Sequence, residues 1–163
     1  RKAVVLLAES EFIDIFGVEN SLTPAMDLFT KLGYLGLTCR LNTDAYLQQI
    51  GAGHLPHGAV AVAFSHSGSS ADTVKALRLA KSHGAKTIAI TNAIGAPLAS
   101  WADVTLLTGR DSHTIYGNAI FSRVADTALV DMLCMGVILS DYGRFSTALD
   151  ESGRMIRDRV FEN

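Results

Sequence analysis

Short apolar runs alternate with amphipathic stretches along the chain. Five of the apolar runs have the length of strands, and several are apolar at nearly every position, as strands covered on both faces must be. These runs are 12–18, 34–41, 58–64, 86–91 and 103–107. We interpret them as the five strands of one sheet.

Between these runs, apolar residues recur at spacings of three and four, which predicts helices. The clearest helix follows the serine-rich stretch at 65–70, with Leu77 and Ala80 on its apolar side and Gly84 at its end. Ser69 and Asp72 have the spacing of a capping box. Further helices are predicted after Pro24, at 44–50, at 95–103, at 118–139 and near the C-terminus.

Strict alternation of strands and helices favours parallel strands joined by right-handed crossovers. The predicted fold class is therefore α/β, a three-layer α/β/α sandwich with a five-stranded parallel sheet. Its 163 residues fit one domain, and we expect 1–163 to form a single unit. Because the chain starts at Arg1 without an initiator Met, we also expect it to be part of a longer protein.

Two polar loops follow predicted strands, at 17–21 and at 65–70. In an open parallel sheet, ligands bind beyond the carboxyl ends of the strands, where successive crossovers go to opposite faces. Each loop leads into a helix whose first N–H groups have no internal partner and favour an anion. A plain surface turn would also explain serine and glycine there, but the pattern and the architecture together favour an anion site.

Composition narrows the classes of function. A net charge of -2 provides no large basic surface for nucleic acid. Cys39 and Cys134 lie far apart without metal-ligand spacing, so we expect small core thiols in a reducing compartment, the cytoplasm, and neither metal nor cofactor. The apolar stretch at 132–140 follows Arg123, Asp126 and Asp131, so it is interpreted as a helix buried in the fold or against another subunit rather than as a membrane span.

Several motifs resemble the sugar isomerase (SIS) domain, which has a flavodoxin-like fold, and in particular the phosphosugar-sensing domain of RpiR-type transcriptional regulators. The motifs are IFGVENS at 15–21, FSHSGSSADTVKALRLAKSHGAKTIAITN at 64–92, GAPLASWADVTLLTG at 95–109 and FSRVADTALVDML at 121–133. The likeness covers almost the whole chain. It implies a sugar phosphate or amino-sugar phosphate ligand, a homo-oligomer (a dimer or a dimer of dimers), and DNA binding only through an N-terminal helix-turn-helix domain outside this chain.

The resemblance also implies the site residues. Hydroxyls and backbone N–H groups of the second loop would hold the phosphate, with Gly68 letting the chain pass close to it. A serine of the first loop would complete the cradle, and neighbouring residues would shape the sugar pocket. The expected phosphosugar-binding residues are Asn20, Ser21, Ser65, His66, Ser67, Gly68 and Ser70.

Two departures from the family pattern affect the expected function. Glu19 stands where the family usually has glycine, and a carboxylate there would repel a phosphate unless it points away. Where the family often places a glutamate base, this chain has Asp111 and His113 but no Glu. We therefore expect ligand sensing without catalysis. The alternatives are an aldose–ketose phosphosugar isomerase with Asp111 or His113 as general base, and a dimerisation domain without a working pocket.

Overall fold

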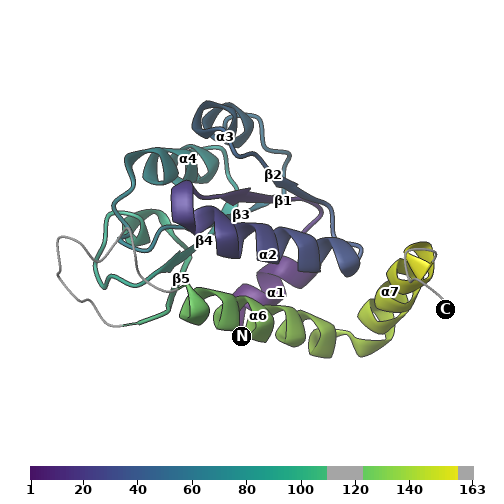
Figure 1. Cartoon of the computed structure of the whole chain (residues 1–163). Coiled ribbons are helices and arrows are strands. Elements are labelled where there is room, and N and C mark those ends of the chain that lie inside the picture. The colour runs from purple at the N-terminus through teal and green to yellow at the C-terminus, as the bar shows by residue number, and fades with distance from the viewer. Residues whose placement is uncertain (110–122, 158–163) are drawn as a thin grey trace.

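Five parallel strands form one sheet in the order β2-β1-β3-β4-β5 in the computed structural model (Figure 1), which describes residues 1–109 and 123–157. The strands are β1 Ile13–Phe16, β2 Cys39–Leu41, β3 Val60–Phe64, β4 Lys86–Thr91 and β5 Val104–Leu107. All four strand pairs are parallel. The predicted α/β architecture is confirmed, although β1 and β2 are shorter than the apolar runs that predicted them.

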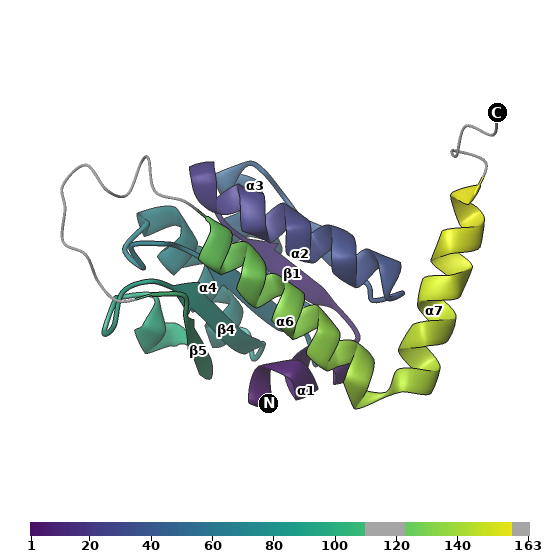
Figure 2. The same cartoon turned by 60° about the horizontal axis from the view of Figure 1, so that its bottom comes forward.

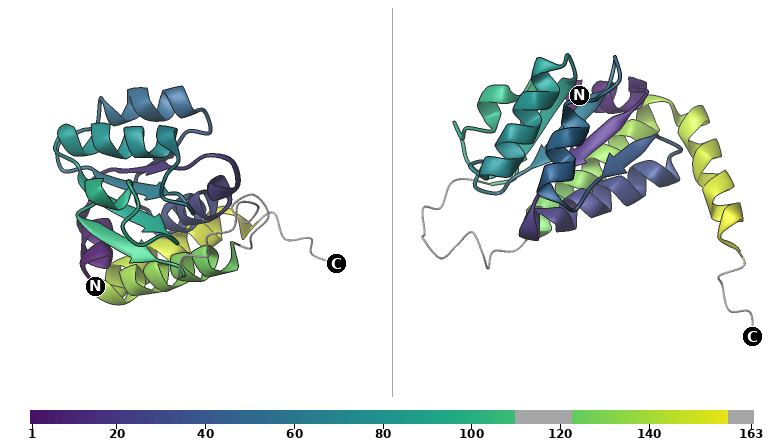
Figure 3. Two further views of the ribbon diagram at one scale, coloured as in Figure 1. Left: turned by 90° about the vertical axis from the view of Figure 1, so that its left-hand side faces the viewer. Right: turned by 90° about the horizontal axis from the view of Figure 1, so that it is seen from above.

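Helices cover both faces of the sheet and produce three layers, most clearly in the left view of Figure 3. The α-helices are α1 Lys2–Glu9, α2 Leu22–Tyr34, α3 Ala45–Ala52, α4 Ala71–Ser82, α6 Val124–Ser140 and α7 Tyr142–Met155, and two short 3-10 helices are η1 Glu19–Ser21 and η2 Ala99–Trp101. Helices α1, α2 and α6 share one core cluster with the sheet, and α3 and α4 share the other. Helix α7 extends away from the sheet (Figure 2).

The two faces of the sheet are packed differently because successive strand residues point to opposite sides. Toward α2 and α6 the strands present large side chains such as Ile15, Val62 and Ile90. Toward α4 they present mainly alanines, including Ala61 and Ala63, which meet the alanines of that helix. Small residues on both surfaces let α4 approach the sheet closely, so the loop before it has a fixed position.

Some local predictions were wrong. Helix α1 was not predicted, because its eight residues had been considered only as a possible targeting or membrane segment. The predicted helix at 95–103 is reduced to η2, where Trp101 is 37% exposed under the Arg78 guanidinium rather than packed in the core. The capping box is also wrong, since Ser70 is the N-cap of α4 and its side chain makes no capping hydrogen bond.

A buried ion pair joins the first two strands. Asp14 in β1 is 1% exposed and receives two hydrogen bonds from Arg40 in β2, at 3.0 and 2.6 Å. Burial raises the pKa of Asp14, and Arg40 opposes that rise. A Cβ at Gly51 of α3 would lie 2.5 Å from the Arg40 guanidinium. The absence of a side chain at Gly51 therefore makes room for this pair.

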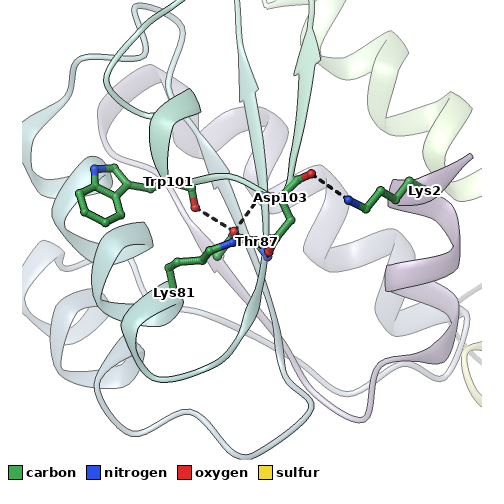
Figure 4. A network of polar contacts seen from close by, with 5 residues as sticks. All are labelled: Lys2, Lys81, Thr87, Trp101 and Asp103. Atoms are coloured by element: carbon green, nitrogen blue, oxygen red, sulfur yellow. Dashed lines mark hydrogen bonds and ion pairs between the residues drawn. The ribbon is translucent and has the colours of Figure 1, made fainter.

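A second polar network joins β4 and β5 at their amino ends (Figure 4). The Asp103 carboxylate accepts hydrogen bonds from the Thr87 backbone N–H at 2.8 Å, from the Thr87 hydroxyl at 3.0 Å and from Lys81. Lys2 of α1 donates to the Asp103 carbonyl, and the Trp101 carbonyl accepts from the Thr87 hydroxyl. These contacts lie at the end of the sheet opposite the polar loops, so Asp103 has a structural role.

Helix α6 is apolar on nearly every side. Its buried residues face α1, α2 and the sheet, while Val124, Met132, Met135 and Leu139 are each more than half exposed. Among the described helices, none combines the length and the apolar character needed to cross a bilayer. The two thiols belong to this side of the fold, and burial raises the pKa of Cys39 to about 12 and that of Cys134 to about 11, so both stay protonated at neutral pH.

Candidate functional site

The polar loops meet where the sheet topology changes direction. From β1 the chain passes to β2 on one side, and it then returns to β3 on the other side of β1. The helices that follow β1 and β3 lie on opposite faces, because α2 packs in one core cluster and α4 in the other. This arrangement opens a crevice at the carboxyl ends of β1 and β3, the usual ligand position in such folds.

A cavity of about 100 Å³ occupies this position. Six of the seven residues predicted to bind the phosphosugar line it, namely Asn20, Ser21, Ser65, His66, Ser67 and Ser70. Its other lining residues are Val18, Glu19 and Arg123. The two loops therefore face one another across a shared space, as the sequence predicted.

Two serines at helix starts leave their hydroxyls out of the helices. Ser21 is the N-cap of α2 and Ser70 is the N-cap of α4, yet neither side chain makes a capping hydrogen bond. A serine at this position usually caps a backbone N–H of the first turn. Since Ser21 and Ser70 do not, capping does not explain these serines, and both hydroxyls line the cavity instead.

The middle of the second loop is held by a turn of its own. The Ser67 hydroxyl oxygen accepts from the Ser69 backbone N–H at 3.3 Å, and the Ser69 hydroxyl donates to the Ser67 carbonyl. Because Ser67 accepts in this contact, its own hydroxyl proton remains able to donate to a ligand. Ser65 is almost fully buried at 3% exposure and marks the floor of the cavity, whereas Ser69 is exposed and does not line it.

Gly68 is needed for a different reason from the predicted one. It is the one predicted binding residue that does not line the cavity. Its φ is +63°, and a Cβ there would collide with Ala96 and lie 2.8 Å from the Thr91 hydroxyl. The residue therefore lets the loop turn back onto the segment after β4, where its carbonyl accepts from the Leu98 N–H at 2.9 Å.

Glu19 has the backbone conformation of a glycine. Its φ is +51°, the only positive value among the non-glycine residues described. For a residue with a Cβ this left-handed conformation costs about 1–2 kcal/mol. The backbone thus keeps the form suited to the glycine that the family pattern has there, although the side chain has changed. Glu19 is exposed and lines the cavity.

His66 is the half-buried imidazole of the site. Its carbonyl accepts from the Asn92 N–H at 3.0 Å and from the Thr91 hydroxyl at 3.1 Å, and its ring Nε2 lies 3.4 Å from the Asn92 amide nitrogen. Burial lowers the pKa of His66, and the charge of Arg123 lowers it further against a smaller effect of Asp126. The ring is therefore neutral at pH 7 and can donate to or accept from a sugar hydroxyl.

Arg123 supplies a positive charge at the cavity. Its Nε lies 4.0 Å from the Asp126 carboxylate, and the two side chains are 11% and 8% exposed. The ion pair that we expected for this arginine is thus present. Arg123 also lines the cavity, although the sequence analysis had not placed it in the site. Sequence spacing indicates the pair within the helix, but only the tertiary fold places the start of α6 beside the two loops.

Gln48 was missed as a residue that positions the site. It is 1% exposed, and its amide donates to the Gly17 carbonyl at 2.7 Å and accepts from the Gly17 N–H at 3.2 Å. It also donates to the Asn42 carbonyl at 2.8 Å. One side chain of α3 therefore fixes the start of the first loop. No local signal separates Gln48 from Gln49 beside it, because the difference arises from which one the helix turns inward.

The residues of the isomerase alternative, Asp111 and His113, lie outside the described residues. Within 1–109 and 123–157 there is no group of three or more His, Cys, Asp or Glu side chains that could hold a metal ion. The chemistry available in the described cavity is hydrogen bonding from hydroxyls and backbone N–H groups, with one guanidinium, one carboxylate and one neutral imidazole.

Curated relatives of the chain include transcriptional regulators. An uncharacterised HTH-type transcriptional regulator of Caldanaerobacter subterraneus is 31% identical over 162 residues, which are 99% of this chain and 57% of that protein. The HTH-type transcriptional regulator RpiR of Escherichia coli K12 is 26% identical over 143 residues, which are 88% of this chain and 48% of that protein. The chain thus spans about half the length of these relatives.

Similarity extends to solved structures and to a family model. The structure of Vibrio vulnificus NanR complexed with ManNAc-6P superposes with a TM-score of 0.91 at 25% identity, over 99% of this chain and 61% of that one. The family model described as the SIS domain matches residues 6–136. This match includes both serine-bearing loops and most of α6. The fold, the paired loops and the match together show that the chain belongs to the SIS domain family.

Proposed function

We propose that this chain is the phosphosugar-sensing domain of a longer helix-turn-helix transcriptional regulator of the RpiR type. The observation that carries the proposal is the single cavity onto which Ser21, Ser67 and Ser70 open from two facing helix starts. The relatives, which are about twice the length of this chain and are regulators, support the regulatory role. The NanR structure, which contains a sugar phosphate, supports the ligand class.

The phosphate is held by groups that donate hydrogen bonds. The N-termini of α2 and α4 point toward the cavity with backbone N–H groups that have no helical partner, and the helix dipoles favour an anion there. Hydroxyls of the three serines add side-chain donors, and Arg123 adds a charge at the rim. Asn20 and His66 contact the sugar. Ligand binding without conversion is the activity proposed, in a reducing cytoplasm where Cys39 and Cys134 remain thiols.

The output of the sensor is a change in a homodimer. The exposed apolar face of α6, formed by Val124, Met132, Met135 and Leu139, is the surface on which a second copy packs. Arg123 at the start of that helix lines the ligand cavity. For the ligand to alter the arrangement of two subunits, it must bind one arrangement more tightly than the other, since equal affinity shifts nothing.

Calorimetry of the chain with hexose 6-phosphates and N-acetylhexosamine 6-phosphates tests the proposal, with the unphosphorylated sugars as controls. We expect at least one sugar phosphate to bind and its parent sugar not to bind. Binding should weaken as salt is added, because a phosphate contact in a partly exposed cradle is screened. Failure of every sugar phosphate to bind, or equal binding of the parent sugars, contradicts the proposal.

The same mixtures distinguish sensing from catalysis. NMR spectra of each bound sugar phosphate should remain those of one compound over hours of incubation. Appearance of a second sugar phosphate would show aldose–ketose isomerisation and would make the chain an enzyme. Sedimentation of the chain with and without the ligand tests the dimer, and a monomer under both conditions contradicts that part of the proposal.

A further inference from the structure

Glu19 is a strained residue that lines the proposed phosphosugar cavity. It is the only non-glycine residue with positive φ in the part of the chain that the structure describes, and a glycine would relieve the strain. Strained residues of this kind persist where the surrounding structure holds them, and they gather at ligand sites. The strain and the place of the side chain at the cavity both raise the question of what its carboxylate does.

The charges at the cavity narrow the answer. The lining described here has one cationic side chain, Arg123, and one carboxylate, Glu19. The charge of Arg123 is already offset in part by Asp126, 4.0 Å away, and His66 is neutral because burial lowers its pKa. The phosphate is therefore held mainly by hydroxyls and backbone N–H groups, and Glu19 remains as a negative group facing the rest of the ligand.

A negative group at this position discriminates among sugar phosphates by their second substituent. A protonated amine donates charge-assisted hydrogen bonds to a carboxylate, which are shorter and stronger than those of a neutral hydroxyl. An N-acetyl group has no charge and replaces two of the donor hydrogens. A second anionic group would be repelled. Because Glu19 is exposed as well as cavity-lining, its carboxylate is placed at the mouth, away from the buried floor at Ser65.

We infer that Glu19 is a specificity-determining residue, which selects amino-sugar phosphates with a free, protonated amine over their hydroxyl and N-acetyl counterparts. This inference rests on the proposed function, since it requires the phosphate of the ligand to lie among Ser21, Ser67 and Ser70. The strain at Glu19 is then compensated by the contact of its carboxylate with the ligand ammonium group.

The test uses sugar phosphates matched in everything but one substituent. Glucosamine, mannosamine and galactosamine 6-phosphates are each compared by calorimetry with their N-acetyl derivative and with the parent hexose 6-phosphate. For the chain itself, we expect at least one amine to bind about tenfold more tightly than both of its counterparts. Equal affinities within every set overturn the inference.

Two variants separate the carboxylate from the backbone strain. Glu19→Gln removes the charge and keeps the side-chain shape, so the preference for the amine should fall to within about twofold while the hexose phosphates bind as before. Glu19→Gly removes both charge and strain, so it should show the same loss of preference with a higher melting temperature. A preference for the amine that persists in Glu19→Gln overturns the inference.

The failure of this inference differs from the failure of the proposed function. Binding of sugar phosphates without a preference that depends on Glu19 overturns only the role of Glu19. If no sugar phosphate binds to the chain or to either variant, the proposed function itself is contradicted, and the inference falls with it. Thermal unfolding of each variant confirms that the comparison is made among folded proteins.

Discussion

The Gln48 side chain makes a closed pair of hydrogen bonds with the backbone of Gly17, donating to its carbonyl at 2.7 Å and accepting from its N–H at 3.2 Å. Gly17 follows the last residue of β1 and begins the loop that contains Glu19 and Ser21. A Cβ at Gly17 would lie 3.1 Å from the Ser21 carbonyl, so the loop is also tightly folded on itself. The pair therefore fixes one wall of the cavity from below.

Replacing Gln48 should weaken the site and the fold together. Gln48→Leu keeps the side-chain size but leaves the N–H and carbonyl of Gly17 buried without partners, which costs about 1–3 kcal/mol. We expect a lower melting temperature and about tenfold weaker sugar phosphate binding, measured by calorimetry. Gln49→Leu is the matched control, because Gln49 makes only an exposed contact with Asp72. Equal effects of the two substitutions would show that Gln48 has no positioning role.

Substitution of the cavity serines should remove phosphate binding and preserve the fold. Ser67→Ala/Ser70→Ala removes two hydroxyl donors, each of which contributes about 1.5–3 kcal/mol to a charged acceptor. Because Ser70 makes no capping bond in α4, the melting temperature should stay nearly unchanged. Affinity for sugar phosphate should fall at least a hundredfold. Ser69→Ala, an exposed serine of the same loop outside the cavity, should bind nearly as the unchanged chain does.

An added methyl group should have opposite consequences at two neighbouring glycines. Gly51→Ala places a Cβ 2.5 Å from the Arg40 guanidinium, and moving that group away exposes the buried Asp14 carboxylate to the loss of its partner. We expect a loss of about 2–3 kcal/mol in the free energy of unfolding, despite the better helix propensity of alanine. At Gly53 the nearest atom is 3.5 Å away, an ordinary contact, so Gly53→Ala should change stability by less than about 0.5 kcal/mol. Urea unfolding of both variants measures the difference.

Asp103 should make the stability of the protein depend on acid. Burial raises the pKa of Asp103, but hydrogen bonds from Lys81 and Thr87 together outweigh burial, so the pKa is below the usual value. A carboxyl whose folded pKa is depressed contributes stability above its unfolded pKa, about 3.9, and loses it as the pH falls through the folded value. Asp103→Asn should therefore lower stability at pH 7 and flatten the acid side of the stability profile below about pH 4.

Thermal unfolding between pH 2 and pH 7 checks this expectation. The exposed Asp150 of α7 provides the control, because Asp150→Asn removes a carboxylate without touching the β4–β5 network. An unchanged profile for Asp103→Asn would mean that the contacts in Figure 4 contribute little to the folded state.

The parts of the site that the sequence predicts are those encoded in a continuous stretch. The serines of 65–70 stand between an apolar run and a helical stripe, so both their loop and its place at the edge of a parallel sheet follow from local pattern. Gly84 likewise ends α4 with a φ of +87°, as its position after the stripe predicts.

The rest of the site depends on contacts between distant segments. Arg123 and Gln48 reach the loops from α6 and α3, and nothing in the residues beside them distinguishes an inward from an outward position. The eight residues of α1 form a helix that is completed by packing on α6, which a local pattern of that length does not specify. Trp101 is apolar enough to predict burial, yet the arginine stacked on it keeps it at the surface.

Helix α6 connects three regions that are otherwise separate. Its first turn adjoins Arg123 at the cavity, its middle meets α1 where a Cβ on Gly136 would lie 2.7 Å from Val4, and its outer side is bare. Seventeen residues of helix are about 26 Å long and stiff. A small tilt at the arginine end would therefore be carried as a lever movement to Ser140 and to the chain's first helix, without any rearrangement of the sheet between them.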